Sequence, residues 1–215
     1  MFSMVKKRKF KWKRKLSIIL IAFTVLGPFL YGLSHVRAVG LISASDLLGQ
    51  FTATGSTVPD YTSSSANNGG SVGDIGFSSP QYTALDTTNH RLFVSDGSNN
   101  RVLVFNLTNS NSLSDYTADN VIGQANFTSN SAAVTSTGLS APRGLAYDST
   151  ANRLFVAQSS ANRVTVYDLS GGITDGMAAS NVLGQSLFTT SAAATTKPGL
   201  SAPLGIAYDE TNFNL

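Results

Sequence analysis

The chain has 215 residues, of which 15 are Lys or Arg and 12 are Asp or Glu, and it contains no cysteine. Nine of the basic residues precede Val39, so residues 39–215 carry six basic and all 12 acidic residues, a net charge of −6. This composition excludes disulfide bonds, and it argues against nucleic-acid binding, which needs clustered Lys or Arg.

The segment 1–38 is typical of an export leader. Eight basic residues lie in Lys6–Lys15, and an uncharged, mostly apolar stretch, Leu16–Leu33, follows directly. Positive charge ahead of an apolar stretch keeps the N-terminus in the cytoplasm and sends the following chain across the membrane. A polybasic run can also bind nucleic acid, but the apolar span behind this one argues otherwise. The sequence predicts a hydrophobic N-terminal helix, with the remaining chain exported.

Two fates of this leader stay open. A helix over Leu16–Leu33 is about 27 Å long at ~1.5 Å per residue, close to the ~30 Å hydrocarbon core, so it can act as an uncleaved membrane anchor. Gly27-Pro28 would interrupt such a helix and leaves an apolar run of signal-peptide length, and Val36 and Ala38 fit a cleavage site. The exported part is therefore either secreted or anchored to the membrane.

The rest of the sequence repeats at a regular spacing. The stretch SSPQYTALDTTNHRLFV, which begins at Ser78, recurs as SAPRGLAYDSTANRLFV from Ser140 and as SAPLGIAYDETNFNL from Ser201. The stretch ADNVIGQANFT from Ala118 recurs as ASNVLGQSLFT from Ala179, and a shorter copy, ASDLLGQFT, occupies residues 44–52. Copies that recur at a fixed period are the signature of a repeat architecture.

These repeats divide the exported part into four segments. They are an early strand with a polar linker (39–79), two complete units (80–141 and 142–202) and the start of a further unit (203–215).

Each complete unit contains four short apolar stretches separated by turn residues, which predicts a four-stranded antiparallel sheet. In the first unit these are residues 82–86, 91–95, 101–105 and 120–124. The second and third stretches are almost continuously apolar, so both of their faces are expected to be buried, as in sheets stacked around an axis. The sequence thus predicts an all-β protein of β-propeller type. The sheets should span Tyr82–Gln124 and Gly144–Gln185, and the first strand of each, with Ala84, Ala146 or Ala207, should lie nearest the axis.

The turn between the second and third strands resembles the NHL repeat, in which Asp-x-x-Asn-Asn-Arg joins two apolar strands. Asp96, Asn99, Asn100 and Arg101 match that pattern position for position. In the next unit Asn162 and Arg163 remain, but Gln158 replaces the aspartate and Ala161 the first asparagine. The resemblance implies a propeller that binds protein, RNA or sugar-containing partners and that only occasionally is an enzyme.

The repeated polar residues are interpreted as structural. Asp96 and Asn99 bracket the turn, and their side chains are expected to accept backbone N–H groups there. Arg101 and Arg163 are expected to reach turn carbonyls or acids of a neighbouring unit. Aspartates recur at the end of the first strand of every unit, which favours turn closure over a metal site; they are Asp86, Asp148 and Asp209.

No catalytic constellation is visible, and no cofactor or metal is expected. The two histidines are His35, in the leader, and His90, in a turn, so no histidine cluster can hold a metal. The expected function is a binding or scaffold module at the outer cell surface, with a protein or carbohydrate ligand on the side where the long Ser/Thr/Asn-rich loops emerge. The alternative is an extracellular metal-dependent lyase or hydrolase whose catalytic residues lie in further units.

The phase of the repeats also suggests a partial ring. The first repeated element is a lone fourth-strand copy at Ser45–Thr52, two complete units follow, and the third ends within its second strand. We expect an open arc in which Ser45–Thr52 has no partner sheet and Ala53–Phe77 is poorly anchored. Apolar faces at the ends of such an arc would favour self-association.

Overall fold

The computed structural model describes residues 47–53, 56, 58–212 and 214–215. The predicted leader, residues 1–38, lies outside the described residues, as does the start of the 39–79 segment. Within the described residues, no helix is long and apolar enough to cross a bilayer.

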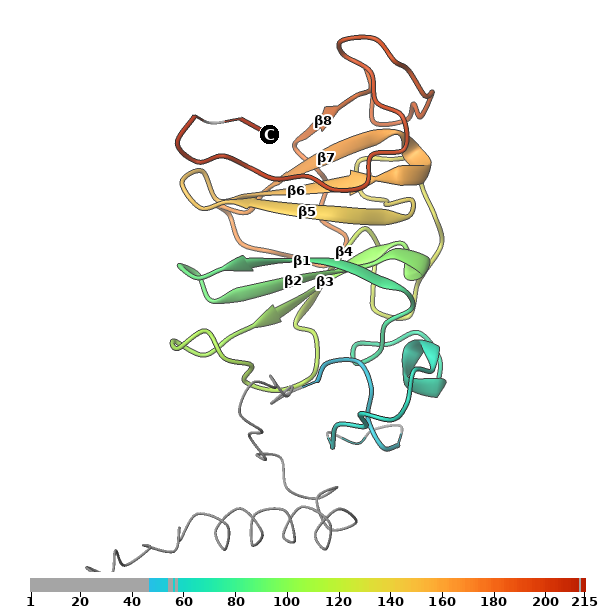
Figure 1. Cartoon of the computed structure of the whole chain (residues 1–215), viewed down its shortest axis with the longest axis vertical. Coiled ribbons are helices and arrows are strands. Elements are labelled where there is room, and N and C mark those ends of the chain that lie inside the picture. The colour runs from blue at the N-terminus through green and yellow to red at the C-terminus, as the bar shows by residue number, and fades with distance from the viewer. Residues whose placement is uncertain (1–46, 54–55, 57, 213) are drawn as a thin grey trace, which may run out of the picture. The chain divides into compact units, whose positions relative to one another are not determined.

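The described part of the chain forms two four-stranded antiparallel sheets, one from each complete repeat (Figure 1). The first sheet contains β1 (Pro80–Asp86), β2 (Arg91–Asp96), β3 (Arg101–Asn106) and β4 (Asn120–Ile122), and the second contains β5 (Pro142–Asp148), β6 (Arg153–Gln158), β7 (Arg163–Asp168) and β8 (Asn181–Leu183). In both sheets the strands pair in sequence order. The predicted all-β fold with two antiparallel sheets is confirmed.

The register is the same in the two sheets. Ala84 pairs with Phe93 in the first sheet, and Ala146 pairs with Phe155 at the corresponding place in the second. Equivalent residues of the two sheets therefore occupy equivalent positions, as the repeat predicts.

Short 3-10 turns join the central strands. They are η3 (Gly97–Asn99) between β2 and β3 and η4 (Ser159–Ala161) between β6 and β7. Asn100 and Asn162 follow these turns with φ values of 52° and 50°, in the left-handed region that asparagine tolerates better than most residues. The Asn-Arg pair that both repeats share therefore lies at the point where the chain reverses direction between the two central strands.

The main core lies between the two sheets. The first sheet contributes Phe93, Val102, Val104 and Ile122, and the second contributes Leu154, Val156 and Tyr167. Phe93 stacks on Tyr147 with ring centroids 5.9 Å apart. The sheets stack face to face, with β1 beside β5 (Figure 1).

Both faces of the central strands are buried, as expected. In β3 the side chains from Arg101 to Phe105 are all buried, because Val102 and Val104 face the second sheet while Leu103 and Phe105 face away from it. A continuous apolar strand needs cover on both faces. On the far side of the first sheet this cover comes from the segment that precedes β1.

That segment corrects one expectation. The described residues of Ser45–Thr52 form no strand, although Phe51 makes an isolated bridge to Pro59. The described residues of Ala53–Phe77 are nevertheless anchored, because Phe77 is only 6% exposed and packs in the same cluster as Leu48. Phe51, just before this segment, is 3% exposed and packs edge-on against Tyr116. A 3-10 turn, η2 (Ala66–Gly69), fixes the middle of the segment, where Asn67 accepts a hydrogen bond from Asn99. The sequence interpretation missed Phe77, which covers the outer face of the first sheet, and Phe51, which packs against Tyr116.

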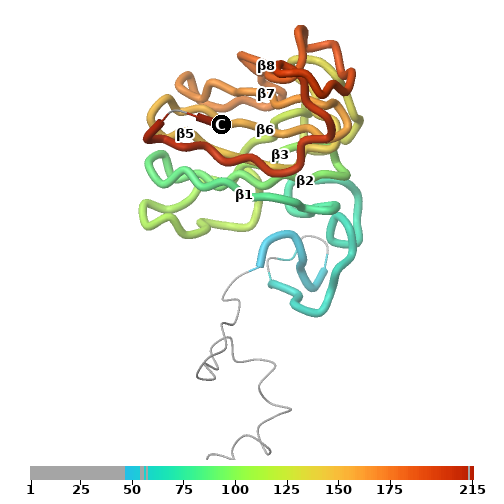
Figure 2. Tube along the Cα trace, turned by 45° about the horizontal axis from the view of Figure 1, so that its top comes forward, coloured from blue at the N-terminus to red at the C-terminus, as the bar shows by residue number. Residues whose placement is uncertain are grey.

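The third repeat begins along β5 (Figure 2). The backbone N–H of Gly144 donates to the carbonyl of Leu204 at 2.7 Å, and Tyr208 stacks on Phe155 at 5.3 Å. Asp209 pairs with Asn214 in an isolated bridge, so the next turn is also formed. This segment repeats the position of β1 and β5 without forming a sheet of its own.

Candidate functional site

One end of the two sheets gathers the turns and long loops that the sequence singled out. Asn100, in the β2–β3 turn, donates from its side-chain amide to the carbonyl of Asn130 and accepts from the N–H of Ala141. Asn162 makes the equivalent bonds to Ser191 and Ala202. The turns and loops therefore emerge on the same side, as predicted. We call this end the loop face; it is formed by residues 78–81, 97–100, 128–143 and 189–202.

Replacing Asn162 by Ala should lower the free energy of unfolding by about 0.5–2 kcal/mol. The substitution removes two hydrogen bonds that tie the β6–β7 turn to the following loop, and it places alanine at a left-handed φ. Chemical denaturation monitored by circular dichroism measures the change. Asn162→Gly is the control, because glycine accepts the backbone conformation but makes neither bond. Loss of ligand binding with an unchanged melt would instead assign Asn162 to recognition.

The turn residues Asp96, Asn99 and Arg101 form a buried cluster under the loop face. Arg101 Nε donates to Asp96 Oδ2 at 2.8 Å with both side chains fully buried, and Asn99 donates to the same oxygen at 2.7 Å. The guanidinium also donates to the carbonyls of Gly76 and Phe127, which belong to the loops before and after the first sheet. Burial raises the pKa of Asp96, against the hydrogen bonds and the charge of Arg101 that lower it.

The second sheet has the same arginine without the aspartate. Arg163 donates to the carbonyls of Phe188, Thr135 and Gly138, again from the loops on both sides of its sheet. Gln158 accepts from Arg163 at 3.1 Å and donates to Thr165, while Arg163 Nε has no hydrogen-bond partner among the described residues. Burial lowers the pKa of Arg163. Arg163 thus contacts carbonyls of the preceding repeat, as expected, whereas Arg101 contacts its own unit and the segment before it.

Replacing Gln158 by Asp should raise the free energy of unfolding by about 1–2 kcal/mol, because Arg163 would gain a carboxylate partner and an acceptor for Nε. Thermal and urea denaturation measure the gain. The reciprocal control is Asp96→Gln in the first sheet, which should be destabilising. A lower stability for Gln158→Asp would show that the desolvation of the new carboxylate outweighs the ion pair.

The aspartates at the ends of β1, β5 and the third copy close the turns at the opposite end. The Oδ1 atom of each accepts the backbone N–H groups two and three residues ahead; the aspartates are Asp86, Asp148 and Asp209. This is the geometry of turn closure that the repeats predict.

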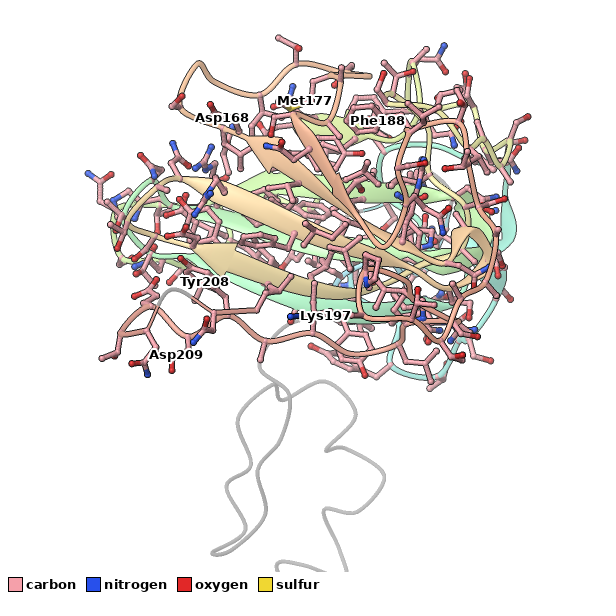
Figure 3. All side chains as sticks on the ribbon, turned by 90° about the horizontal axis from the view of Figure 1, so that it is seen from above. Asp168, Met177, Phe188, Lys197, Tyr208 and Asp209 are labelled. Carbon is pink, nitrogen blue, oxygen red and sulfur yellow. The ribbon has the colours of Figure 1, made fainter. Side chains whose placement is uncertain are left out.

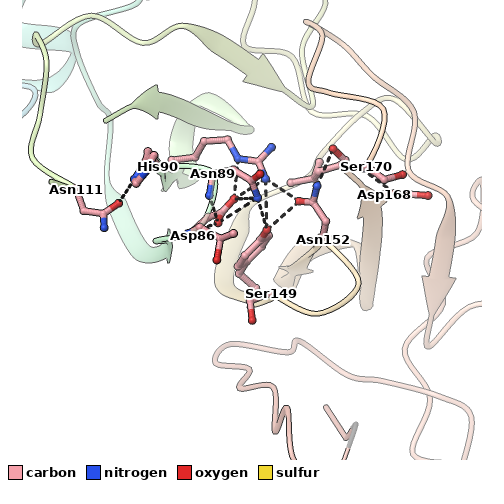
Figure 4. A network of polar contacts seen from close by, with 12 residues as sticks. Asp86, Asn89, His90, Asn111, Ser149, Asn152, Asp168 and Ser170 are labelled. Carbon is pink, nitrogen blue, oxygen red and sulfur yellow. Dashed lines mark hydrogen bonds and ion pairs between the residues drawn. The ribbon is translucent and has the colours of Figure 1, made fainter. Parts of the chain in front are cut away.

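A polar network joins the two sheets at that end (Figure 4). Arg91 donates to Asp86 at 2.5 Å and to Asn152 of the second sheet at 2.6 Å, and Tyr147 also donates to Asn152 at 2.8 Å. The equivalent pair in the second sheet, Arg153 and Asp148, is more open, since the Arg153 side chain is 39% exposed. The sequence interpretation did not identify this network, because it depends on which residues meet across the two sheets.

Acid should destabilise the protein through these turns. Burial alone would raise the pKa of Asp86 and of Asp148, but the turn N–H groups and Arg91 or Arg153 hold each pKa below its usual value. A lowered folded-state pKa contributes stability above the unfolded pKa of about 3.9, and this stability is lost as the pH falls through the folded-state value.

We therefore expect the free energy of unfolding to fall below about pH 4, and expect Asp86→Asn with Asp148→Asn to flatten that dependence. Urea denaturation between pH 2 and pH 6, about the range of carboxylate titration, measures it. An equally steep profile in the double variant would contradict the assignment.

The sequence interpretation also missed the structural role of a repeated Gly-Gln pair. Glycines at the same place in the three repeats, Gly49, Gly123 and Gly184, have φ values of 87°, 89° and 85°. Gln124 donates to the carbonyl of Asn100 in the β2–β3 turn and to that of Ser131 in the following loop, and Gln185 bonds Asn162 and Ala192 in the same way. The Leu-Gly-Gln and Ile-Gly-Gln triplets were the signal, since a glycine recurring at a fixed place indicates a left-handed backbone or a close contact.

A polar pocket of about 280 Å³ opens on the loop face between the two sheets. Arg143 donates to Gln81 at 2.7 Å and to Ser159 at 3.2 Å, and Gln81 donates to the hydroxyl of Ser79 at 2.9 Å. The lining also includes Ser98 and Asn100. The pocket therefore presents amide, hydroxyl and guanidinium groups. The buried clusters around Arg101 and Arg163 hold the turns and loops that line it.

Two adjacent positions of the first strand differ between the repeats, and the first of them supplies Gln81 and Arg143 to the pocket. Gln81, Arg143 and Leu204 are equivalent positions, and so are Tyr82, Gly144 and Gly205. Tyr82 is 42% exposed, and its hydroxyl lies 3.2 Å from where a side chain would begin at Gly205. The residues that every unit needs for turn closure recur, whereas these positions have diverged.

A comparison with protein-family models and with curated proteins finds no match for this chain. The resemblance to the NHL repeat accordingly rests on the repeated turn residues themselves.

Proposed function

We propose that this chain is an exported NHL-type propeller module that binds a protein or carbohydrate ligand at its loop face. The observation that carries the proposal is the polar pocket between the sheets, in which the repeats diverge from one another. Divergence within an otherwise repeated scaffold is expected where a residue serves a ligand rather than the fold. The charge and hydropathy of residues 1–38 support the export part of this proposal.

The chemistry of the pocket favours a ligand rich in hydroxyl or carboxylate groups. Gln81 and Ser98 can donate and accept hydrogen bonds, and Arg143 adds a cation with several donors. The exposed ring of Tyr82, which follows Gln81 in β1, can pack on a sugar ring or an apolar side chain. The net charge of −6 on residues 39–215 disfavours nucleic acid.

The enzyme alternative gains no support from the site. Among the residues that the structure describes, no three His, Cys, Asp or Glu side chains gather as metal ligands. Asp86, Asp96 and Asp148 are each paired with an arginine.

The test is binding of the labelled full-length chain to an array of neutral oligosaccharides, uronic-acid oligosaccharides and peptides. Arg143→Met should weaken the strongest signal about tenfold or more, because it removes a charged donor from the pocket. Gln81→Ala should also weaken it. The matched control is Asn111→Ala at the opposite end of the sheets, where the side chain bonds His90. Equal binding by the Arg143 and Asn111 variants would refute a ligand site in this pocket.

A further inference from the structure

The outer face of the second sheet is a partly open apolar cleft. A volume of about 700 Å³ lies between β7, β8 and the segment 197–207, and its lining includes Val164, Leu183, Leu200 and Ile206. Leu183 is 42% exposed, whereas its equivalent in the first sheet, Ile122, is fully buried against the second sheet. The cleft is therefore the same face that, one repeat earlier, is covered by a neighbouring sheet.

The segment Pro203–Tyr208 runs beside this cleft, in the position that corresponds to β1 and β5 of the earlier repeats. Leu204 accepts a hydrogen bond from β5, and Tyr208 and Asp209 follow along the same segment (Figure 3). In the first two repeats the equivalent strands pair with β2 and β6, but Pro203–Tyr208 pairs with no strand among the described residues. An unpaired backbone edge next to an apolar cleft fits the addition of an antiparallel strand.

The loop before Pro203–Tyr208 has the same backbone bond as the loop before β5. The N–H of Ala194 donates to Leu200, as Ala133 does to Leu139. The residue before the strand has a positive φ in each case, 47° at Ala141 and 43° at Ala202. The loop is thus preformed.

Two backbone groups in the loop before each of the first two sheets bond side chains of that sheet's β-hairpin, and they indicate which side chains would bind beside the cleft. In the first sheet, Ser78 N–H donates to the Asp96 carboxylate and Gly76 C=O accepts from Arg101. In the second sheet, Ser140 N–H donates to Gln158 and Gly138 C=O accepts from Arg163.

The equivalent groups of the third loop are the N–H of Ser201 and the carbonyl of Gly199. Within the described residues neither has a hydrogen-bond partner. Backbone groups that are buried on docking need such partners. An aspartate would suit the first group and an arginine the second.

We infer that the cleft and these two backbone groups form a socket for a β-hairpin of the same repeat type, with an aspartate at the start of its turn and an arginine five residues later. The hairpin adds its first strand to Pro203–Tyr208 and places its apolar residues over Leu183 and Leu200. Its arginine donates to Gly199, and its aspartate accepts from Ser201. This inference does not depend on the proposed ligand site.

The test uses the absence of cysteine from the chain. A second copy of residues 93–106 is fused after Leu215 of the full-length Leu183→Cys variant. Leu215 aligns with Leu92 of the first repeat, so the added copy continues the third repeat in register. We expect the rate of thiol modification to fall about tenfold or more, because the docked hairpin covers the cleft. Leu85→Cys, at an exposed position of β1, is the matched control and should change less than about twofold.

Versions of the added hairpin separate the socket from general apolar cover. Asp96→Asn or Arg101→Met in the added copy should remove most of the protection, and residues 155–168, which lack the aspartate, should protect less than residues 93–106. An unprotected thiol in a chain whose two sheets melt normally overturns the inference, as does equal protection by all hairpins. A thiol rate that falls with protein concentration in the chain without an added hairpin also overturns it, because a second copy would then be the occupant.

Discussion

Replacing Arg101 by Met should lower the free energy of unfolding by about 3–5 kcal/mol. The guanidinium is fully buried, and its loss leaves the Asp96 carboxylate uncompensated in the interior. The carbonyls of Gly76 and Phe127 lose their donor as well. Methionine fills part of the volume, so most of the cost comes from the unpaired polar groups. Urea denaturation followed by circular dichroism measures it.

The control for this substitution is Arg153→Met. Arg153 also pairs with an aspartate, but its side chain is 39% exposed, and exposed ion pairs contribute only about 0–1 kcal/mol. A double variant, Arg101→Met with Asp96→Asn, should recover part of the loss, because it removes the buried charge. If Arg101→Met were no more harmful than Arg153→Met, the buried cluster would not be what holds the first sheet to its loops.

Replacing Gly123 by Ala should lower the free energy of unfolding by about 2–4 kcal/mol. The backbone of Gly123 has a φ of 89°, which side chains with a Cβ rarely adopt. A Cβ there would also lie 2.4 Å from Leu139 Cδ1, in a fully buried part of the core. Both the backbone strain and the displacement of Leu139 act against the folded state. Thermal and urea melts of the variant measure their sum.

Gly171→Ala is the control, because a Cβ at that position meets nothing within 4 Å. It should change the stability by less than about 0.5 kcal/mol. Gly184→Ala tests the repeat, since its Cβ would meet Leu200 at 2.7 Å in the partly open cleft. We expect a smaller loss there than at Gly123, because Leu200 has more room to move. Equal effects at Gly171 and Gly123 would contradict the packing argument.

The strands and their pairing could be predicted because the same pattern occurs in both complete repeats. The apolar runs around Asp96-Gly-Ser-Asn-Asn-Arg give both the strand limits and the turn, and the same register recurs in the second sheet. Local sequence is sufficient here, since neighbouring strands pair through short turns. The contact of Arg101 and Arg163 with turn carbonyls was also predictable from their recurrence.

The contacts between sheets were not predictable in the same way. Arg91 meets Asn152 across the stack, and Gln81 meets Arg143, although the members of each pair belong to different repeats. Such pairs depend on how two sheets are offset and rotated, which no local pattern records. The anchoring of the segment before β1 was missed for the same reason, since Phe51 and Phe77 are isolated aromatics in a polar sequence.

The two buried arginines have a consequence for how the protein unfolds. Each one bonds the loop before its own sheet and the loop after it, so the loop between the sheets is held by Arg101 from one side and by Arg163 from the other. Opening either sheet leaves hydrogen-bonding groups of its neighbour without partners, which couples their melting as in a one-dimensional array with strong nearest-neighbour terms. A stretched molecule should consequently rupture in one large force event rather than one sheet at a time.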